Sequence, residues 1–194
     1  MKTGGLTSRA TRSKANINLM ASIKPLLHRL GLDPKKSLGQ NFCVDDKLPT
    51  SVLELLEPAS GDHVWEIGPG LGALTQLLLA LPIQLTGFEI DRTLQPHLEE
   101  LFAGKPNGHL EWGDFLKARH DLLRPTNDPL VVCGNLPYSS GTAMVRLLLE
   151  ELFPAPKRMV FLLQKEMVDK ATAQPNTEAF SFFSVVVQLF SEAK

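Results

Sequence analysis

The stretch HVWEIGPGLGA, residues 63–73, decides the fold of this chain. Its first five residues are mostly apolar, which predicts a buried strand over 63–67. The next six fit the pattern G-x-G-x-x-G/A, and an apolar helix is predicted to follow over 71–81. A strand that passes through a glycine-rich turn into a helix indicates an α/β fold.

Strands and helices continue to alternate along the chain. Apolar and periodic runs predict further strands over 84–90, 109–112, 130–133 and 159–163, and helices over 46–56, 94–102, 142–153 and, broken around 174–176, over 164–194. Such alternation predicts a mostly parallel sheet with helices on both faces. The length of 194 residues suits one domain, over 22–194, after a flexible basic tail over 1–21. A short helix that Ser22 caps and Gly31 ends is expected to open the domain.

The composition is that of an ordinary globular protein, with 43% hydrophobic and 21% charged residues. No apolar run approaches the roughly 18 residues that span a membrane. The first 16 residues contain no apolar core of a secretory signal. The two cysteines, Cys43 and Cys133, lie far apart and form no CxxC pair. No disulfide scaffold and no metal site is therefore expected, and the cytoplasm is the expected compartment.

The net charge of −1 hides a strong asymmetry. Residues 1–36 carry eight basic side chains and one acid, a net charge of +7, which leaves −8 for residues 37–194. A basic arm on an acidic body predicts a polyanionic partner that is reached through the N-terminus. A solvated, disordered tail and an organelle transit peptide remain the alternative interpretations of the first 20 residues.

Acidic residues recur where successive strands are predicted to end. Glu89 and Asp91 follow the glycine motif by about 20 residues, which is the place of a ribose-binding acid. Asp114 follows the third strand, where it can accept a hydrogen bond from an adenine amine. The glycines alone also fit a structural turn, and each acid alone also fits a helix cap.

Glu66 helps to decide between the two cofactors that the glycine motif can serve. It lies two residues before Gly68, where a carboxylate would repel the pyrophosphate of NAD. S-adenosylmethionine instead carries an ammonium and a sulfonium, which an acid attracts. The acids after successive strands therefore favour S-adenosylmethionine, with Gly68 and Gly70 as candidate cofactor-binding residues of the loop.

The tetrapeptide Asn135-Leu136-Pro137-Tyr138 follows the fourth predicted strand and so lies at the carboxyl end of the sheet. An amide, a proline turn and an aromatic ring there suit the binding of a flat ring that carries an amine. The Asn135 side chain and the Leu136 carbonyl can accept the two hydrogens of the amine. Pro137 fixes the turn without a competing N–H, and Tyr138 can stack on the base. The alternative is that Tyr138 is a rigid loop aromatic that packs on Leu136.

With these motifs in this order, the chain resembles the rRNA adenine N6,N6-dimethyltransferases of the KsgA type. The resemblance covers about residues 35–190 and rests on the segments 39–42, 66–72, 89–91, 113–114, 135–138 and 163–166. It implies a Rossmann-like class I methyltransferase fold and a monomeric enzyme that uses S-adenosylmethionine. It also implies the target, two adjacent adenosines near the 3′ end of small-subunit rRNA, each of which receives two methyl groups during biogenesis of the small ribosomal subunit.

By position, the resemblance implies a cofactor site formed by Asn41, Cys43, Gly68, Glu89, Asp114 and Asn135, with Asn135 to Tyr138 as the catalytic motif. Cys43 stands where the family has leucine, a change that a main-chain contact survives. Lys35 and Lys36 of the basic arm are the candidate RNA-binding residues. A large-subunit rRNA adenine methyltransferase and an RNA-binding assembly factor with little catalysis remain alternatives, and residues 163–166 favour the small-subunit type.

The sequence departs from the family pattern in two places. Residues 180–184 replace a tyrosine-glycine-arginine-leucine-serine run, which removes one possible RNA-facing charge. The family continues with a Pro-Pro-Pro-Lys-Val segment, two strands and a small helical domain, whereas this sequence ends at Lys194. The resemblance therefore predicts that the last strands and the C-terminal helical domain are missing, which would expose a sheet edge and an apolar surface.

Overall fold

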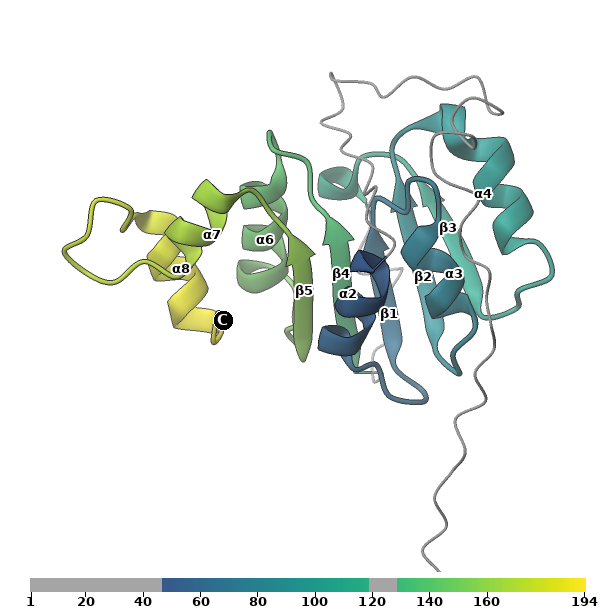
Figure 1. The fold of residues 1–194 in the computed structure, drawn as a ribbon, viewed down its shortest axis with the longest axis horizontal. Helices are drawn as coiled ribbons and strands as arrows, with labels where there is room; N and C mark the ends of the chain where they lie inside the picture. Colours follow the sequence, from purple (N-terminus) through teal and green to yellow (C-terminus); the bar gives the residue numbers. More distant parts are fainter. Residues whose placement is uncertain (1–46, 119–128) are drawn as a thin grey trace, which may run out of the picture.

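The computed structural model describes residues 47–118 and 129–194. In these residues five parallel strands form one sheet in the order β3-β2-β1-β4-β5, with helices on both faces (Figure 1). The strands are β1 (His63–Ile67), β2 (Gln84–Glu89), β3 (Gly108–Trp112), β4 (Leu130–Asn135) and β5 (Arg158–Leu162). The predicted α/β fold with a parallel sheet is confirmed. The predicted tail and the helix between Ser22 and Gly31 lie outside the described residues.

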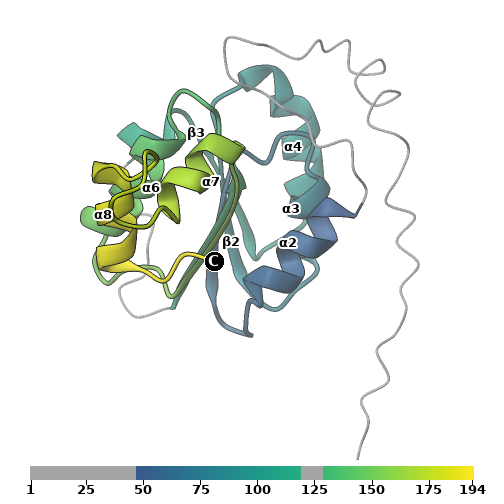
Figure 2. The same cartoon turned by 60° about the vertical axis from the view of Figure 1, so that its left-hand side comes forward.

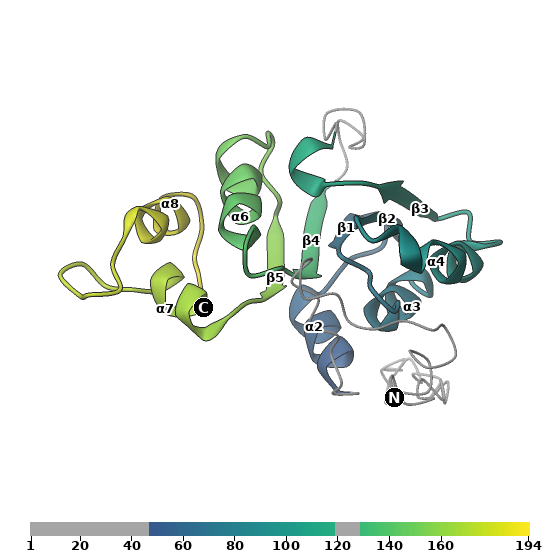
Figure 3. The ribbon, with the colours of Figure 1, turned by 90° about the horizontal axis from the view of Figure 1, so that it is seen from above.

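Helices from the two halves of the chain cover opposite faces of the sheet (Figure 3). The helices α2 (Leu48–Leu56), α3 (Ala73–Leu79) and α4 (Gln95–Phe102) lie on one face, and α6 (Gly141–Glu150) lies on the other. The helices α7 (Lys165–Ala171) and α8 (Phe182–Phe190) pack on each other beyond β5, and α8 also packs on α6 (Figure 2). Right-handed crossovers explain this arrangement, because the chain moves outward from β1 in one direction and from β4 in the other.

The predicted element boundaries needed small corrections. The helix predicted over 71–81 begins only at Ala73, because Gly72 has a positive φ of 80° that a helix does not contain. A side chain at Gly72 would also place its Cβ 2.4 Å from Leu101 Cδ2 of α4. The short 3-10 helices η2 (Arg92–Leu94) and η3 (Phe115–Lys117) follow β2 and β3. Residues 172–181 lie outside α7 and α8, so the break predicted around 174–176 is longer than expected.

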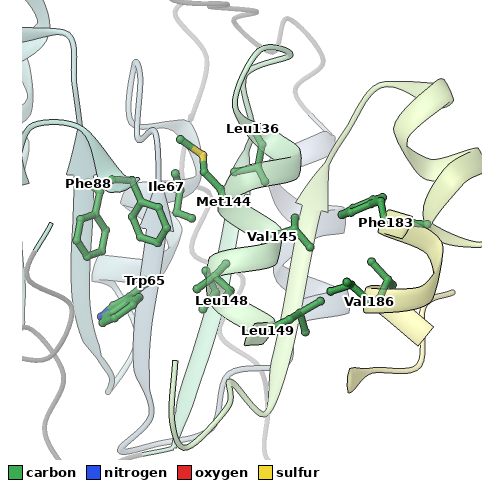
Figure 4. Packing of buried hydrophobic residues seen from close by; sticks show 14 of the residues in the cluster. Trp65, Ile67, Phe88, Leu136, Met144, Val145, Leu148, Leu149, Phe183 and Val186 are labelled. Carbon is green, nitrogen blue, oxygen red and sulfur yellow. The ribbon is translucent and has the colours of Figure 1, made fainter. Parts of the chain in front are cut away.

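The larger part of the core lies between the sheet and α6 and contains three aromatic rings in edge-to-face contact (Figure 4). The ring of Trp65 lies 5.2 Å from that of Phe88, and the ring of Phe88 lies 5.0 Å from that of Phe115. Such pairs add about 0.5–1.5 kcal/mol each beyond the burial of their area. These rings fix the carboxyl ends of β1 and β2 relative to the loop after β3.

The C-terminal part of the described chain carries exposed apolar side chains. Phe182, Val185, Leu189 and Phe190 of α8 are all more than two-fifths exposed. Among the described residues β5 is the edge strand on this side of the sheet. No helix in 47–118 or 129–194 is long and apolar enough to cross a membrane.

Candidate functional site

A cavity of about 330 Å³ opens at the carboxyl ends of the strands, where β1 and β4 lie side by side. At this point the strand order reverses, since the chain leaves β1 toward β2 and later returns to β4. Open parallel sheets bind their ligands at such a switch point. Predicted site residues from four strand ends line the cavity together, namely Gly68, Gly70, Glu89, Asp114, Asn135 and Pro137.

The glycine loop forms the wall of the cavity next to β1. The Gly68 N–H donates to the Phe88 carbonyl at 2.9 Å, which ties the start of the loop to β2. The Gly70 N–H donates to Glu89 Oε2 at 3.0 Å. The loop is therefore held in place by the strand that carries the predicted ribose-binding acid.

Glu89 is a buried carboxylate with most of its acceptor positions filled. Only 4% of the residue is exposed, and three backbone N–H groups donate to its side chain: Gly70 to Oε2, and Ile90 and Asp91 to Oε1 at 2.9 Å. Burial raises the pKa of Glu89, and the three backbone donors oppose that rise. A carboxylate has about four acceptor positions, so this side chain retains room for one further donor from the cavity.

Asp91 and Asp114 both cap short helices, but only one of them reaches the cavity. Asp91 Oδ1 accepts from the Thr93 N–H at 3.0 Å at the start of η2, and Asp91 does not line the cavity. Asp114 Oδ1 accepts from the Leu116 N–H at 3.1 Å at the start of η3, and this residue does line the cavity. The helix-cap interpretation is correct for both acids, and Asp114 combines the cap with a place in the cavity wall.

Glu66 lies in the cavity wall with only 2% of its surface exposed. The Thr75 hydroxyl of α3 donates to Glu66 Oε2 at 2.7 Å. Burial raises the pKa of Glu66 to about 7, while the Thr75 hydroxyl lowers it and the nearby Glu89 carboxylate raises it. In 47–118 and 129–194 no basic side chain forms an ion pair with Glu66 or Glu89. This wall of the cavity therefore favours a cationic or hydrogen-donating ligand.

Asn135 is the last residue of β4, two positions beyond the end predicted for this strand, and pairs with Leu162 of β5. The preceding residue, Gly134, allows β1 and β4 to approach, because a Cβ there would lie 2.4 Å from the Ile67 carbonyl oxygen. Asn135 is exposed and lines the cavity. The register of the sheet thus places the amide of Asn135 across the cavity from the acids of β1 and β2.

The rest of the tetrapeptide turns away from β4 into α6. Leu136 is buried in the core, and its N–H donates to the Leu162 carbonyl at 3.2 Å. The Pro137 carbonyl accepts from the Gly141 N–H at 2.9 Å at the start of α6. Tyr138 is 53% exposed and does not line the cavity. The structure therefore places Asn135 and Pro137 in the cavity, Leu136 in the core and Tyr138 on the surface.

Four predicted residues, Asn41, Cys43, Lys35 and Lys36, lie outside the described residues.

The structure also adds residues that the sequence did not predict. Ile90 lines the cavity although it is 51% exposed, and it lies between the two acids that the motif singled out. Leu48, Pro49 and Val52 of α2 line the cavity as well. The only sequence signal for this position was the apolar face of the helix. In the part of the chain that the structure describes, no three side chains of a metal-binding kind come together.

The family model and the curated relatives that match this chain indicate the same family. The family model described as ribosomal RNA adenine dimethylase matches residues 31–194. The small-subunit rRNA methyltransferase A of Borreliella burgdorferi is 38% identical over 173 residues, which are 89% of this chain and 60% of that protein. The protein of the same name from Treponema denticola is 37% identical over 186 residues, 94% of this chain and 62% of that protein. The chain therefore spans about three-fifths of the length of these curated relatives.

Solved structures agree with this comparison. A dimethyladenosine transferase from Plasmodium falciparum has a TM-score of 0.62 and 25% identity, over 75% of this chain and 51% of that one. The 23S rRNA methyltransferase ErmE has a TM-score of 0.56 and 34% identity, over 68% of this chain and 51% of that one. The Rossmann-like methyltransferase fold is thus confirmed. With the family match over residues 31–194 and the cavity at the ends of β1 to β4, the chain belongs to the ribosomal RNA adenine dimethylase family.

Proposed function

We propose that this chain carries the catalytic part of an enzyme that uses S-adenosylmethionine to methylate the N6 amine of two adjacent adenosines near the 3′ end of small-subunit rRNA. Each adenosine receives two methyl groups, in the cytoplasm and during biogenesis of the small ribosomal subunit. The observation that carries this proposal is that one cavity brings Asn135 together with Glu89 and Asp114. The cavity thus holds an amide at the end of β4 together with two acids at the ends of β2 and β3, on the other side of β1.

The residues of the cavity fit S-adenosylmethionine. Glu66 and Glu89 are buried acids without an ion-pair partner among the described residues, which suits a cationic cofactor and not a pyrophosphate. Glu89 would accept from a ribose hydroxyl, and Asp114 from the adenine amine. The backbone of Gly68 and Gly70 allows close approach, and we keep Asn41 and Cys43 as proposed contacts. When bound, S-adenosylmethionine supplies an electrophilic methyl group.

The amine of adenine is a poor nucleophile, because the lone pair of its nitrogen is delocalised into the ring. Two acceptors, one for each N–H, can rotate the amine so that the lone pair points toward the methyl group. Asn135 supplies one acceptor through its side-chain oxygen, and the Leu136 carbonyl supplies the other. The Pro137 carbonyl is already occupied by N–H groups at the start of α6, whereas no backbone N–H of the described residues donates to the Leu136 carbonyl. This difference supports the Leu136 carbonyl as the proposed main-chain acceptor. Positioning of this kind can contribute about 7–11 kcal/mol to the lowering of a barrier.

Tyr138 is proposed to hold the target base from outside the cavity. Tyr138 is 53% exposed in the loop that joins β4 to α6, next to the cavity-lining Pro137. Stacking of a base on an aromatic ring contributes about 1–3 kcal/mol. Lys35 and Lys36 are proposed to bind the RNA backbone, which is the partner that the basic arm suits.

A large-subunit target is the second candidate. The observation in its favour is the 34% identity to the 23S rRNA methyltransferase ErmE. The curated relatives named as small-subunit methyltransferases match with 37–38% identity over 89–94% of the chain, which favours the small subunit. A binding factor with little catalysis would use the same RNA surface but would not need the acceptors of Asn135.

The test is methyl transfer from radiolabelled S-adenosylmethionine to unmethylated small-subunit particles, with unmethylated large-subunit rRNA as the second substrate. Asn135→Ala should lower the rate by about 100-fold or more, the usual effect of removing a preorganised hydrogen-bonding group at a reacting atom. Thr142→Ala, on the exposed side of α6 and outside the cavity, is the matched control and should keep the rate. An Asn135→Ala rate near that of the unmodified chain would refute the assignment. RNA binding without methyl transfer by the unmodified chain would favour the binding factor.

A further inference from the structure

Glu66 is a buried acid in the cavity wall, and the proposed function assigns it no particular atom of the cofactor or the substrate. Its Oε2 accepts from the Thr75 hydroxyl at 2.7 Å. No donor among the described residues lies within hydrogen-bond distance of its Oε1. Glu66 also lines the cavity and is only 2% exposed, so a charge placed in the cavity lies beside a carboxyl group that water hardly reaches.

The described residues around Glu66 offer no positive charge. From β2 it faces the Glu89 carboxylate, and from β4 it faces the buried thiol of Cys133, whose pKa is raised by burial and by Glu66. From α3 it meets only the hydroxyl of Thr75, because α3 contains no titratable side chain. A carboxylate in this position would be buried without a cationic partner among the described residues, and such a group gains a proton unless a cation arrives.

We propose that Glu66 is the counter-charge for a cationic group of the bound cofactor, and that it holds a proton in the free protein and releases it to solvent on binding. This inference rests on the proposed use of S-adenosylmethionine. The Thr75 hydroxyl keeps donating to Oε2 in both states, so Oε1 carries the proton that leaves. The carboxylate that remains is then neutralised by the ligand, and Thr75 acts as a positioning residue.

The pKa of about 7 places the exchange in the neutral range. Below that pH the cofactor must displace a proton, so its affinity should fall as the pH falls. If the bound ligand lowers the pKa of Glu66 well below 6, the affinity should rise about fivefold between pH 6 and pH 7, and only about twofold between pH 7 and pH 8. At pH 6.5 binding should release about 0.7 proton for each cofactor bound.

Isothermal titration calorimetry of the whole chain tests the inference without any catalysis. Binding at pH 6.5 is measured in buffers of different ionisation enthalpy, so that the released protons are counted directly. The ligands are S-adenosylmethionine, S-adenosylhomocysteine, which keeps the ammonium but lacks the sulfonium, and 5′-methylthioadenosine, which lacks both charges. Proton release with the first two ligands supports the ammonium as the partner of Glu66, and release with S-adenosylmethionine alone supports the sulfonium.

Two variants separate a charge effect from a structural one. Glu66→Gln keeps an oxygen for Thr75 but has no proton to lose, so the proton release should vanish and the pH dependence of binding should flatten. Thr75→Val removes a donor that lowers the pKa of Glu66, so the rise in affinity should move to higher pH while the proton release persists. The inference would be overturned if Glu66→Gln released as many protons on binding as the unmodified chain. Proton release on binding of 5′-methylthioadenosine would overturn it as well. If the unmodified chain binds no S-adenosylmethionine at pH 8, the proposed function fails instead.

Discussion

Replacing Glu66 by glutamine should make the protein more stable above neutral pH and leave its stability unchanged at low pH. Burial raises the pKa of Glu66 from 4.5 to about 7, so the folded protein disfavours the ionised form. Below pH 4.5 the carboxyl is neutral in both the folded and the unfolded chain, and no destabilisation arises. The destabilisation grows between pH 4.5 and 7 and is complete above pH 7. At about 1.36 kcal/mol for each pKa unit, it reaches about 3 kcal/mol.

Urea denaturation at pH 5 and pH 8, followed by circular dichroism, measures this effect. The free energy of unfolding of Glu66→Gln should exceed that of the unmodified chain by about 3 kcal/mol at pH 8 and by under 1 kcal/mol at pH 5. Glu54→Gln, on the exposed side of α2, is the matched control and should stay within about 0.5 kcal/mol at both pH values. Equal stability of Glu66→Gln and the unmodified chain at pH 8 would show that the cavity hydrates the carboxylate, and the reasoning from burial would be wrong.

Two further substitutions test the packing that positions the site. Gly134→Ala places a Cβ 2.4 Å from the Ile67 carbonyl oxygen, so β1 and β4 must separate, and urea denaturation should show a loss of about 3 kcal/mol or more. A loss below 1 kcal/mol would mean that the strands shift at little cost. Trp65→Ala removes a fully buried ring that contacts both Phe88 and Phe115 and should cost about 3–5 kcal/mol, whereas Trp112→Ala at the sheet edge should cost less than half as much. Similar losses for the two tryptophans would contradict the assigned core.

The sheet could be predicted because its strands are apolar runs separated by turn residues. All five predicted strands are present, and the β1 prediction matches the structure at both ends. The errors occur where neighbours decide the backbone. The helix after the glycine loop starts late because Gly72 has a left-handed conformation against α4. The strand β4 extends through Asn135 because it pairs with Leu162, a contact that no local pattern contains.

The acids of the site could be predicted from their positions after strands, since parallel strands bring their carboxyl ends to one edge. The sequence did not predict which of these acids only caps a helix and which also lines the cavity. Asp91 is used by η2, while Asp114 serves η3 and the cavity together. The partner of Glu66 was also hidden, because Thr75 lies nine residues further along the chain and belongs to a helix. Such pairings depend on the rotation of α3 against the sheet, which periodicity alone leaves open.

The order of the strands explains why one cavity holds both an acidic wall and an amide. Leaving β1, the chain builds β2 and β3 on one side, and each of their carboxyl ends supplies an acid, Glu89 and Asp114. It then returns across the sheet to β4, which places Asn135 on the other side of β1. In the proposed reaction, a cofactor held by the acids and an amine held by Asn135 therefore approach the same point from opposite sides. Since Glu66 lies on β1 itself, between the two groups, the proposed counter-charge would act on the ligand where the two halves of the site meet.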